Sequence, residues 1–442
     1  MPHRSWLCLC IVIGAALRLI WLDDMEYKGD QIYIFDSCQA ALAGAPLPEL
    51  GMPSGPGLLN PGMSLWWHIA YCRAFDVRTP LALAYLSPAL AVLALLLAWW
   101  FVERNIPQPE RPAWLWSIAL ASVSTLEVSL TRIIWSQTIL PLFSVLFLWS
   151  YFRRETRVGA LFWGLLGALV GQIHMSGFFF TSAFVAAERL SARRRRTRWV
   201  PWLVGTLLGA LPMLPWLRYL AQQATDAHSG GRPLPKRVAE VGKLLFWLYG
   251  LSAPWGLELS YRLGFRSWLQ FLAEPVVSGV PTYLIGLCHV AVIALGVHVY
   301  VAAWRAPRTG PDNRVKRWLL AFRTGGLSET EHALTAGLFG MGVLLTLTTL
   351  RLHRHYLIIL FPLWSVFFCM LALRHVPKAP RLLASMWALS LCVTLGFLFH
   401  VHHHGGAVDQ EYGTAYRHQA TRPRNQLAAE DTTPQSRETS NR

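Results

Sequence analysis

The sequence predicts an all-α polytopic membrane protein with about 11 transmembrane helices. Of its 442 residues, 54% are hydrophobic, only 14% are charged, and 21 are Trp, more than a soluble globular chain usually carries. The apolar runs are long and continuous, and each span needs roughly 20 apolar residues to cross about 30 Å of hydrocarbon. They do not alternate in the way that the strands of a β-barrel would.

The apolar runs define the expected helices. We place them roughly at 6–22, 79–102, 113–130, 135–152, 158–174, 177–190, 199–217, 276–303, 333–350, 356–373 and 382–400. The first run could be mistaken for a signal peptide, but Arg18 and Trp21 stand where a small-residue cleavage site would be expected. We therefore expect a retained first helix.

The basic residues indicate the orientation of the chain. They cluster in short loops on one predicted side, at 153–157, 193–198 and 374–381. Because short loops rich in Lys and Arg stay in the cytoplasm, we expect a cytoplasmic N-terminus, and an odd number of spans then places the C-terminus outside. Because the basic residues lie in short clusters between apolar runs, we attribute the net charge of +16 to membrane topology, and we expect the lipid bilayer, and no nucleic acid, as a partner.

The predicted spans leave one membrane domain, 1–420, and a polar C-terminal tail, 421–442, whose composition predicts disorder. The largest pieces outside the membrane are the first outer loop, 23–78, and the second, 218–275. The second is rich in aromatic residues with scattered Arg, which suits a helix lying in the membrane interface.

The first outer loop carries five acidic residues within fourteen positions: Asp23, Asp24, Glu26, Asp30 and Asp36. A single carboxylate beside a span is most often a solvated cap. A cluster suits an enzyme that moves a group from a membrane-borne donor to an external acceptor, because that reaction needs a general base at the membrane surface. Carboxylates can also hold a divalent cation, although no spacing here is specific to a metal.

A Gly/Pro-rich stretch follows, GMPSGPGLLNPGMS at 51–64, and it includes Asn60. Its backbone cannot continue as a helix or a central strand. An ordinary surface turn is one reading. The length of the stretch, and its richness in Gly and Pro, suit a loop shaped to fit a ligand or cover a site.

Polar residues at other span ends fall on the same predicted side as the acidic loop. They are Arg132, His174, Arg351, His353, Arg354, His355 and Tyr356. Arg132, Arg351 and Arg354 are candidates for a lipid phosphate, because guanidinium grips phosphate in two places; interfacial snorkelling is the alternative. His174 lies in a tight turn between Gln172 and Ser176, which favours it among the histidines.

Two further groups of residues suggest a metal site or a disulfide. The histidines of 400–404 could bind a metal, but no Cys and no acid at helical i,i+4 spacing accompanies them. Cys38 and Cys72 both fall in the first outer loop and could form a disulfide in an oxidising compartment.

Six short motifs occur in an order that resembles bacterial membrane glycosyltransferases of family 39. They are EYKGDQIYIFD (26–36), GMPSGPGLLNPGMS (51–64), TRIIWSQTILPLFSVLFLW (131–149), QIHMSGFF (172–179), RLHRHYLIILFPLW (351–364) and HHHGGAVDQEYGTAYRHQ (402–419). That family belongs to the GT-C class, with the protein O-mannosyltransferases and the lipid A aminoarabinose transferase. Its first outer loop carries a catalytic acidic motif, for which Asp30 is the best match. Gln31 replaces the second acid, whose role is open to Glu26 or Asp36.

The resemblance implies a GT-C-like fold in a bacterial inner membrane, with the site on the periplasmic face. The donor would be a sugar linked to polyprenyl phosphate, and the acceptor a glycan, lipid or protein. Asp30 and Glu26 would be catalytic, with Asp30 as general base in an inverting transfer; a divalent cation is the one cofactor left open. The expected substrate-binding residues are Asp36, Asn60, Arg132, Gln137, His174, Arg351, Arg354 and Tyr356.

Two other functions stay open on the sequence. A transporter or flippase of lipid-linked sugars would line a path with charges deep inside its spans, and few such charges are found here. A non-catalytic subunit of an envelope-polysaccharide system would be consistent with Gln31 in place of an acid.

Overall fold

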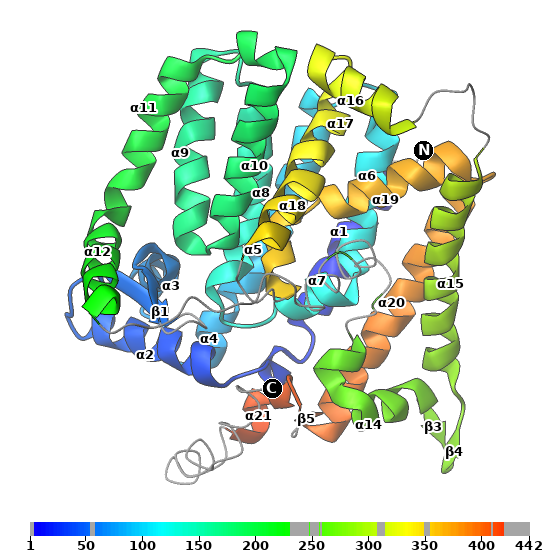
Figure 1. Ribbon diagram of the computed structural model, residues 1–442. Helices are drawn as coiled ribbons and strands as arrows, with labels where there is room; N and C mark the ends of the chain where they lie inside the picture. The colour runs from blue at the N-terminus through cyan, green and yellow to red at the C-terminus, as the bar shows by residue number, and fades with distance from the viewer. Residues whose placement is uncertain are drawn as a thin grey trace.

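The computed structural model describes residues 4–53, 58–229, 247, 256, 259–306, 314–348, 354–407 and 410–419. This part of the chain forms a helical bundle with three two-stranded hairpins (Figure 1). The predicted disordered tail, 421–442, and much of the second outer loop lie outside the described residues.

The helical elements, in chain order, have the following bounds. In the first half they are α1 Arg4–Leu19, η1 Leu22–Asp24, α2 Gly29–Leu42, α3 Met63–Phe75, α4 Pro80–Ala84, α5 Leu86–Asn105, α6 Arg111–Val123, α7 Thr125–Leu130, η2 Ser136–Ile139, α8 Leu140–Phe152, α9 Arg157–Ile173, α10 Ser176–Leu190 and η3 Ala192–Arg195. In the second half they are α11 Trp199–Ala210, η4 Leu211–Met213, α12 Leu214–Ser229, α14 Leu259–Ala273, α15 Leu284–Arg305, α16 Arg314–Thr324, α17 Glu329–Leu334, η6 Thr335–Gly340, α18 Met341–Leu347, η7 Arg354–Leu360, α19 Leu363–His375, α20 Ala379–His404 and α21 Tyr416–Gln419.

Among the described residues, four helical segments are long and apolar enough to cross a membrane: Pro80–Asn105, Trp199–Gln223, Leu284–Arg305 and Ala379–His404. Each corresponds to a predicted span. Three shorter apolar helices, Ser136–Phe152, Arg157–Ile173 and Leu363–His375, match predicted spans too. The protein is therefore of the multi-pass membrane type, while the count of eleven spans stays a prediction.

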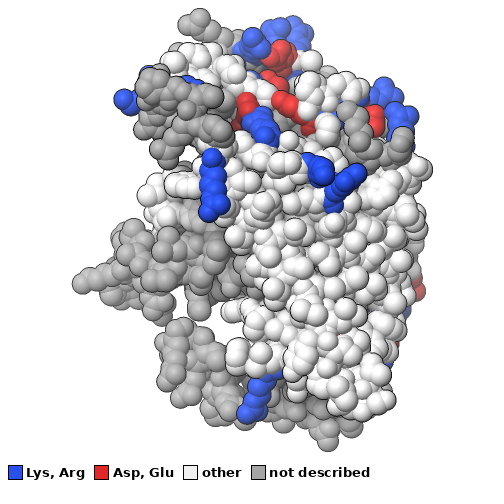
Figure 2. Space-filling model, turned by 90° about the vertical axis from the view of Figure 1, so that its right-hand side faces the viewer, with Lys and Arg blue, Asp and Glu red and all other residues white. Residues whose placement is uncertain are grey.

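Charged side chains are unevenly distributed over the surface. Figure 2 shows most of those on one face gathered at one end, above a wide band that carries few charges. That end holds α16 and α17 in Figure 1. An uncharged band of this kind suits contact with hydrocarbon, because a charge exposed there would lose its hydration.

Several predicted helices are interrupted for local reasons. The run predicted at 113–130 divides into α6 and α7, because Ser124 adopts an extended conformation (φ −60°, ψ 127°). The run predicted at 356–373 divides at Pro362, which lacks the N–H that a continuous helix would need.

The start predicted for the helix at 276–303 is wrong. Residues Val276–Val277 (β3) and Val280–Pro281 (β4) pair as an antiparallel hairpin, and α15 begins at Leu284. Ser278 and Gly279 form the turn, both with positive φ (52° and 80°), as a two-residue primed turn requires. Apolar composition alone did not distinguish this short hairpin from helix.

The first outer loop is folded. It contains α2, α3 and a hairpin of Leu50–Pro53 (β1) with Leu59–Pro61 (β2). Figure 1 places α2, α3 and β1 at the same end of the bundle as α14, β5 and α21, opposite α16 and α17. The strands Gly406–Ala407 (β5) and Gly413–Thr414 (β6) pair just after α20. The described elements expected on the outer face thus share one end.

Candidate active site

Asp30 lies in the first turn of α2, and its side chain is exposed. A carboxylate is favoured there because the N-terminus of a helix carries partial positive charge. The next residue, Gln31, is buried, and its Oε1 accepts a hydrogen bond from the backbone N of Lys28 at 3.1 Å. The residue that replaces the expected second acid therefore caps α2.

A residue distant in sequence donates a hydrogen bond to the carboxylate of Asp30. Nε1 of Trp135 donates a hydrogen bond to Oδ2 of Asp30 at 2.8 Å. Trp135 is extended (φ −150°, ψ 142°) where the chain enters η2. Its ring meets the ring of His355, which belongs to η7, edge-on with centroids 4.8 Å apart.

His174 and Tyr356 extend this series of contacts. Nδ1 of His174 accepts a hydrogen bond from the backbone N of Ser176 at 3.2 Å and lies 2.7 Å from its Oγ, so the turn between α9 and α10 fixes the ring. The His174 ring lies 5.2 Å from that of His355 and 5.1 Å from that of Tyr356. Asp30, Trp135, His355, His174 and Tyr356 are called the Asp30 cluster below.

The Asp30 cluster brings together four segments that are distant in sequence. Three of its members, Asp30, His174 and Tyr356, are among the predicted site residues. The other two, Trp135 and His355, fall within predicted motifs, but only the fold shows their contacts with Asp30 and His174. The cluster combines a carboxylate that can accept a proton with imidazole and phenol groups that can donate hydrogen bonds to phosphate or sugar oxygens.

Glu26 and Asp24 are buried and ion-paired. Glu26 lies 3.0 Å from Arg262 of α14 and 2.9 Å from Lys28. Asp24 lies 2.6 Å from Nδ1 of His402 and 3.1 Å from Nε of Arg417. These pairs join the first outer loop to α14, to the last turn of α20 and to the chain that follows it. Their carboxylates are already occupied by cations, whereas Asp36 is exposed on α2.

The buried guanidinium of Arg132 donates to one carbonyl in the last turn of α1 and to two carbonyls just beyond it. Its partners are Leu17 O at 2.8 Å, Ile20 O at 2.6 Å and Trp21 O at 2.6 Å. The last carbonyls of a helix lack intrahelical partners, so Arg132 satisfies groups that would otherwise be costly to bury. We infer no phosphate contact for it.

Asn60 and Gln137 also have contacts within the protein. Nδ2 of Asn60 donates to Met52 O at 2.9 Å across the β1–β2 hairpin. Gln137 is buried in η2, next to the Ser136 hydroxyl, which donates to its Oε1 at 3.4 Å. Arg351 lies outside the described residues, and so does the side chain of Arg354.

Cys38 of α2 and Cys72 of α3 are both buried, free thiols. They are in hydrogen-bond contact, and the pKa of Cys38 is raised chiefly by that contact and further by burial. The structure therefore places the two cysteines of the first outer loop side by side.

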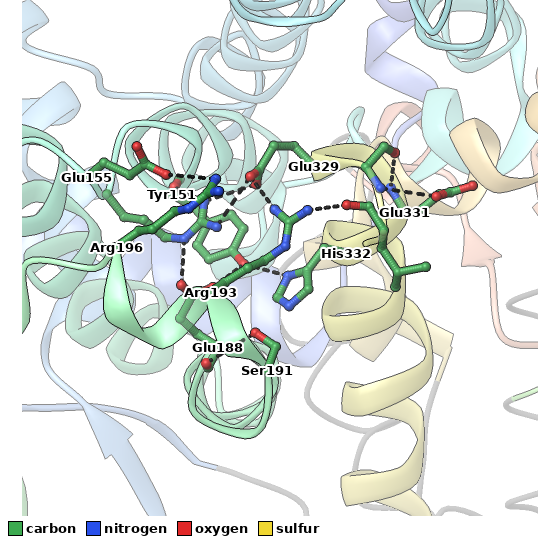
Figure 3. A network of polar contacts seen from close by, with 12 residues as sticks. Tyr151, Glu155, Glu188, Ser191, Arg193, Arg196, Glu329, Glu331 and His332 are labelled. Atoms are coloured by element: carbon green, nitrogen blue, oxygen red, sulfur yellow. Dashed lines mark hydrogen bonds and ion pairs between the residues drawn. The ribbon is translucent and has the colours of Figure 1, made fainter. Parts of the chain in front are cut away.

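A second polar network (Figure 3) includes residues of α17, which Figure 1 places at the opposite end of the bundle. Buried Arg154 lies 3.0 Å from both Glu188 and Glu329, and Arg193 pairs with Glu329. The hydroxyl of Tyr151 donates to Glu188 at 3.0 Å and meets Nδ1 of His332 at 2.7 Å. The network joins α8, α10 and α17. Because its charges pair with one another, the network connects the helices and does not resemble the charged path of a transporter.

Comparisons with known proteins found distant structural neighbours. No protein-family model and no curated protein matches the chain. Two crystal structures of the Archaeoglobus fulgidus oligosaccharyltransferase are similar. The apo form has a TM-score of 0.47 and 12% sequence identity, and it covers 98% of this chain. The form tethered to an acceptor peptide with the NVT sequon has a TM-score of 0.44 and 11% identity, and it covers 93%. The chain spans 58% and 55% of the length of those two chains.

Proposed function

We propose that this protein is a membrane glycosyltransferase that moves a sugar from a polyprenyl-phosphate donor to an acceptor at the outer face of the membrane. The observation that carries the proposal is the Asp30 cluster. Its carboxylate is exposed to an incoming group, and the hydrogen bond from Trp135 orients it. The donor class, the membership of family 39 and the bacterial inner membrane rest on the motif resemblance alone.

In the proposed reaction, an acceptor hydroxyl attacks the anomeric carbon of the sugar. Asp30 accepts the hydroxyl proton as the new C–O bond forms. The bond from the anomeric carbon to the phosphate oxygen breaks, and the polyprenyl phosphate leaves with its electron pair. A single displacement inverts the anomeric configuration.

Asp30 is better placed for this role than Glu26. The carboxylate of Glu26 is paired with Arg262 and Lys28. If it accepted a proton, both ion pairs would be lost, which would cost free energy in each turnover. We assign Glu26 the role of fixing the loop against α14. Asp30 keeps one carboxylate oxygen, Oδ1, away from the Trp135 hydrogen bond, and that oxygen can take the proton.

Imidazole and phenol groups of the same cluster suit the phosphate and the sugar. His174, His355 and Tyr356 carry N–H and O–H groups, which stabilise charge developing on the leaving phosphate without supplying a general acid. Arg351 and Arg354 precede or begin η7, the element that carries His355 and Tyr356. We propose that their guanidinium groups bind the phosphate.

The test is release of free polyprenyl phosphate from a panel of polyprenyl-phosphate sugars. Purified protein in detergent is incubated with each donor and with envelope extract as acceptor. The proposal predicts release from at least one donor, dependent on the extract. If no donor releases lipid phosphate while the protein moves labelled donor across vesicles, the protein is a transporter and the proposal is wrong.

A further inference from the structure

Two histidines and a carboxylate converge at the outer end of α20, away from the contacts of the Asp30 cluster. His400 and His404 are four positions apart in α20, so they lie on the same face of the helix. Glu274 directly follows α14. Its Oε1 lies 2.7 Å from Nδ1 of His400 and 3.1 Å from Nε2 of His404, and the three ligand atoms all lie within 4.8 Å of one another.

The neighbouring histidines, His402 and His403, do not pair with Glu274. His402 stacks on Trp21, with ring centroids 4.3 Å apart, and pairs with Asp24. His403 is exposed and stacks on Phe399. The histidines of this run therefore face three directions, and only His400 and His404 meet Glu274.

The hydrogen bonding of this group is uneven. Glu274 and His400 are 6% and 0% exposed, whereas the His404 side chain is 40% exposed. Oε1 of Glu274 serves both imidazoles, while Oε2 of Glu274 and Nε2 of His400 are buried without a hydrogen-bond partner among the described residues. Buried polar atoms without partners are costly, and a cation between the imidazoles and the carboxylate would engage the second oxygen.

We propose that Glu274, His400 and His404 bind a divalent transition metal, with zinc as the best match. Two imidazole nitrogens and one carboxylate are a common ligand set for zinc, whereas magnesium and calcium prefer oxygen ligands. Tetrahedral zinc with bonds of about 2.0–2.1 Å separates its ligand atoms by about 3.3 Å. Small side-chain movements would bring the three ligand atoms to these separations.

The proposed metal joins two elements that meet at this end of the protein. It links α14 to the last turn of α20, just before β5, β6 and α21. That following segment carries Tyr412, whose hydroxyl donates to Asp24 O at 2.6 Å, and Arg417, which pairs with Asp24. The metal would therefore hold in place the segment whose Tyr412 and Arg417 bind Asp24, at the start of the first outer loop. A fourth coordination position, on the exposed side near His404, is left for water.

The test is a zinc titration of full-length protein purified through a tag that contains no histidine. The protein is stripped with a chelator, and bound zinc is measured by elemental analysis and by competition with a fluorescent chelator. The visible spectrum of the cobalt(II) form reports the coordination geometry. Glu274→Gln and His404→Gln each remove one ligand, and His403→Gln removes an exposed histidine of the same helical turn that makes no contact with Glu274.

We expect one equivalent of tightly bound zinc in the wild type and in His403→Gln, with a tetrahedral cobalt spectrum. Both ligand variants should lose at least about tenfold in zinc affinity. Zinc should raise the melting temperature of the wild type and His403→Gln but not of the ligand variants, and this comparison also shows that the stripped variants fold. Equal zinc binding by all four proteins, or no tight binding by the wild type, would mean that the group is only a hydrogen-bonded triad.

Discussion

Trp135 donates a hydrogen bond of 2.8 Å from its indole Nε1 to Oδ2 of Asp30, across 105 residues of sequence. The bond leaves Oδ1 available and fixes the direction in which the carboxylate faces. Because Trp135 also meets the ring of His355, one side chain links the proposed base to the proposed phosphate-binding element.

Trp135→Phe should lower turnover by about ten- to hundredfold, with a smaller change in the donor KM. The substitution keeps an aromatic ring but removes the N–H, so the Asp30 carboxylate loses its orientation. The measurement is the rate of lipid-phosphate release against donor concentration. Trp67→Phe is the matched control, because Trp67 is half-buried and its Nε1, which is buried, has no hydrogen-bond partner among the described residues. Equal losses in both variants would count against a positioning role for Trp135.

Gly62→Ala should destabilise the first outer loop by about 1–3 kcal/mol. A Cβ at Gly62 would lie 2.1 Å from Pro48 O and 2.8 Å from Glu49 O, and neither backbone atom can move alone. The measurement is the thermal unfolding midpoint in detergent. Gly29→Ala is the control, since a Cβ there has no heavy atom within 4 Å. If both variants unfold at the same temperature, the backbone around Gly62 is looser than described.

His68 of α3 should make the protein less stable in acid. Burial lowers the pKa of this side chain to about 4, from about 6.5 when it is exposed. Between these pH values the unfolded chain binds a proton that the folded chain does not. Stability should therefore fall as the pH drops from about 6.5 to about 4, by up to roughly 1.4 kcal/mol per pH unit. The dependence disappears above the unfolded pKa.

Thermal midpoints measured across this range give the test for His68. The midpoint of His68→Gln should fall less steeply with pH than that of the wild type, because Gln does not titrate. The difference between the two curves removes the contribution of the other histidines. Parallel curves would show that His68 is protonated in the folded protein, contrary to its burial.

Much of the bundle was predictable because a membrane-type helix needs a long apolar run, and such runs are visible in sequence. The run at 382–400 became α20, and the run at 158–174 became α9. The β3–β4 hairpin was missed because its valines are as apolar as a span, and its turn is specified by only two residues. The polar motifs predicted that Asp30, His174 and Tyr356 would lie at one end, which is where the structure brings them together.

The particular partners could not be predicted, because they depend on contacts between distant segments. Arg132 looked like a phosphate ligand, and its use as a cap for α1 depends on how α1 packs beside it. The i,i+4 spacing of His400 and His404 is visible in sequence, but their carboxylate is 126 residues away from His400. Gln31 looked like a lost acid until its contact with the backbone of Lys28 identified it as a cap.

The most direct test of the central claim is the single-turnover rate of Asp30→Asn with a donor that the wild type uses. Donor binding is measured separately, and Asp76→Asn is the control. Asp76 is an exposed acid of the same loop, with a left-handed backbone (φ 48°) that Asn tolerates. We predict that Asp30→Asn binds donor normally but loses turnover by at least about a thousandfold, while Asp76→Asn keeps the wild-type rate. Turnover by Asp30→Asn at the wild-type rate would contradict the assignment of Asp30 as the base.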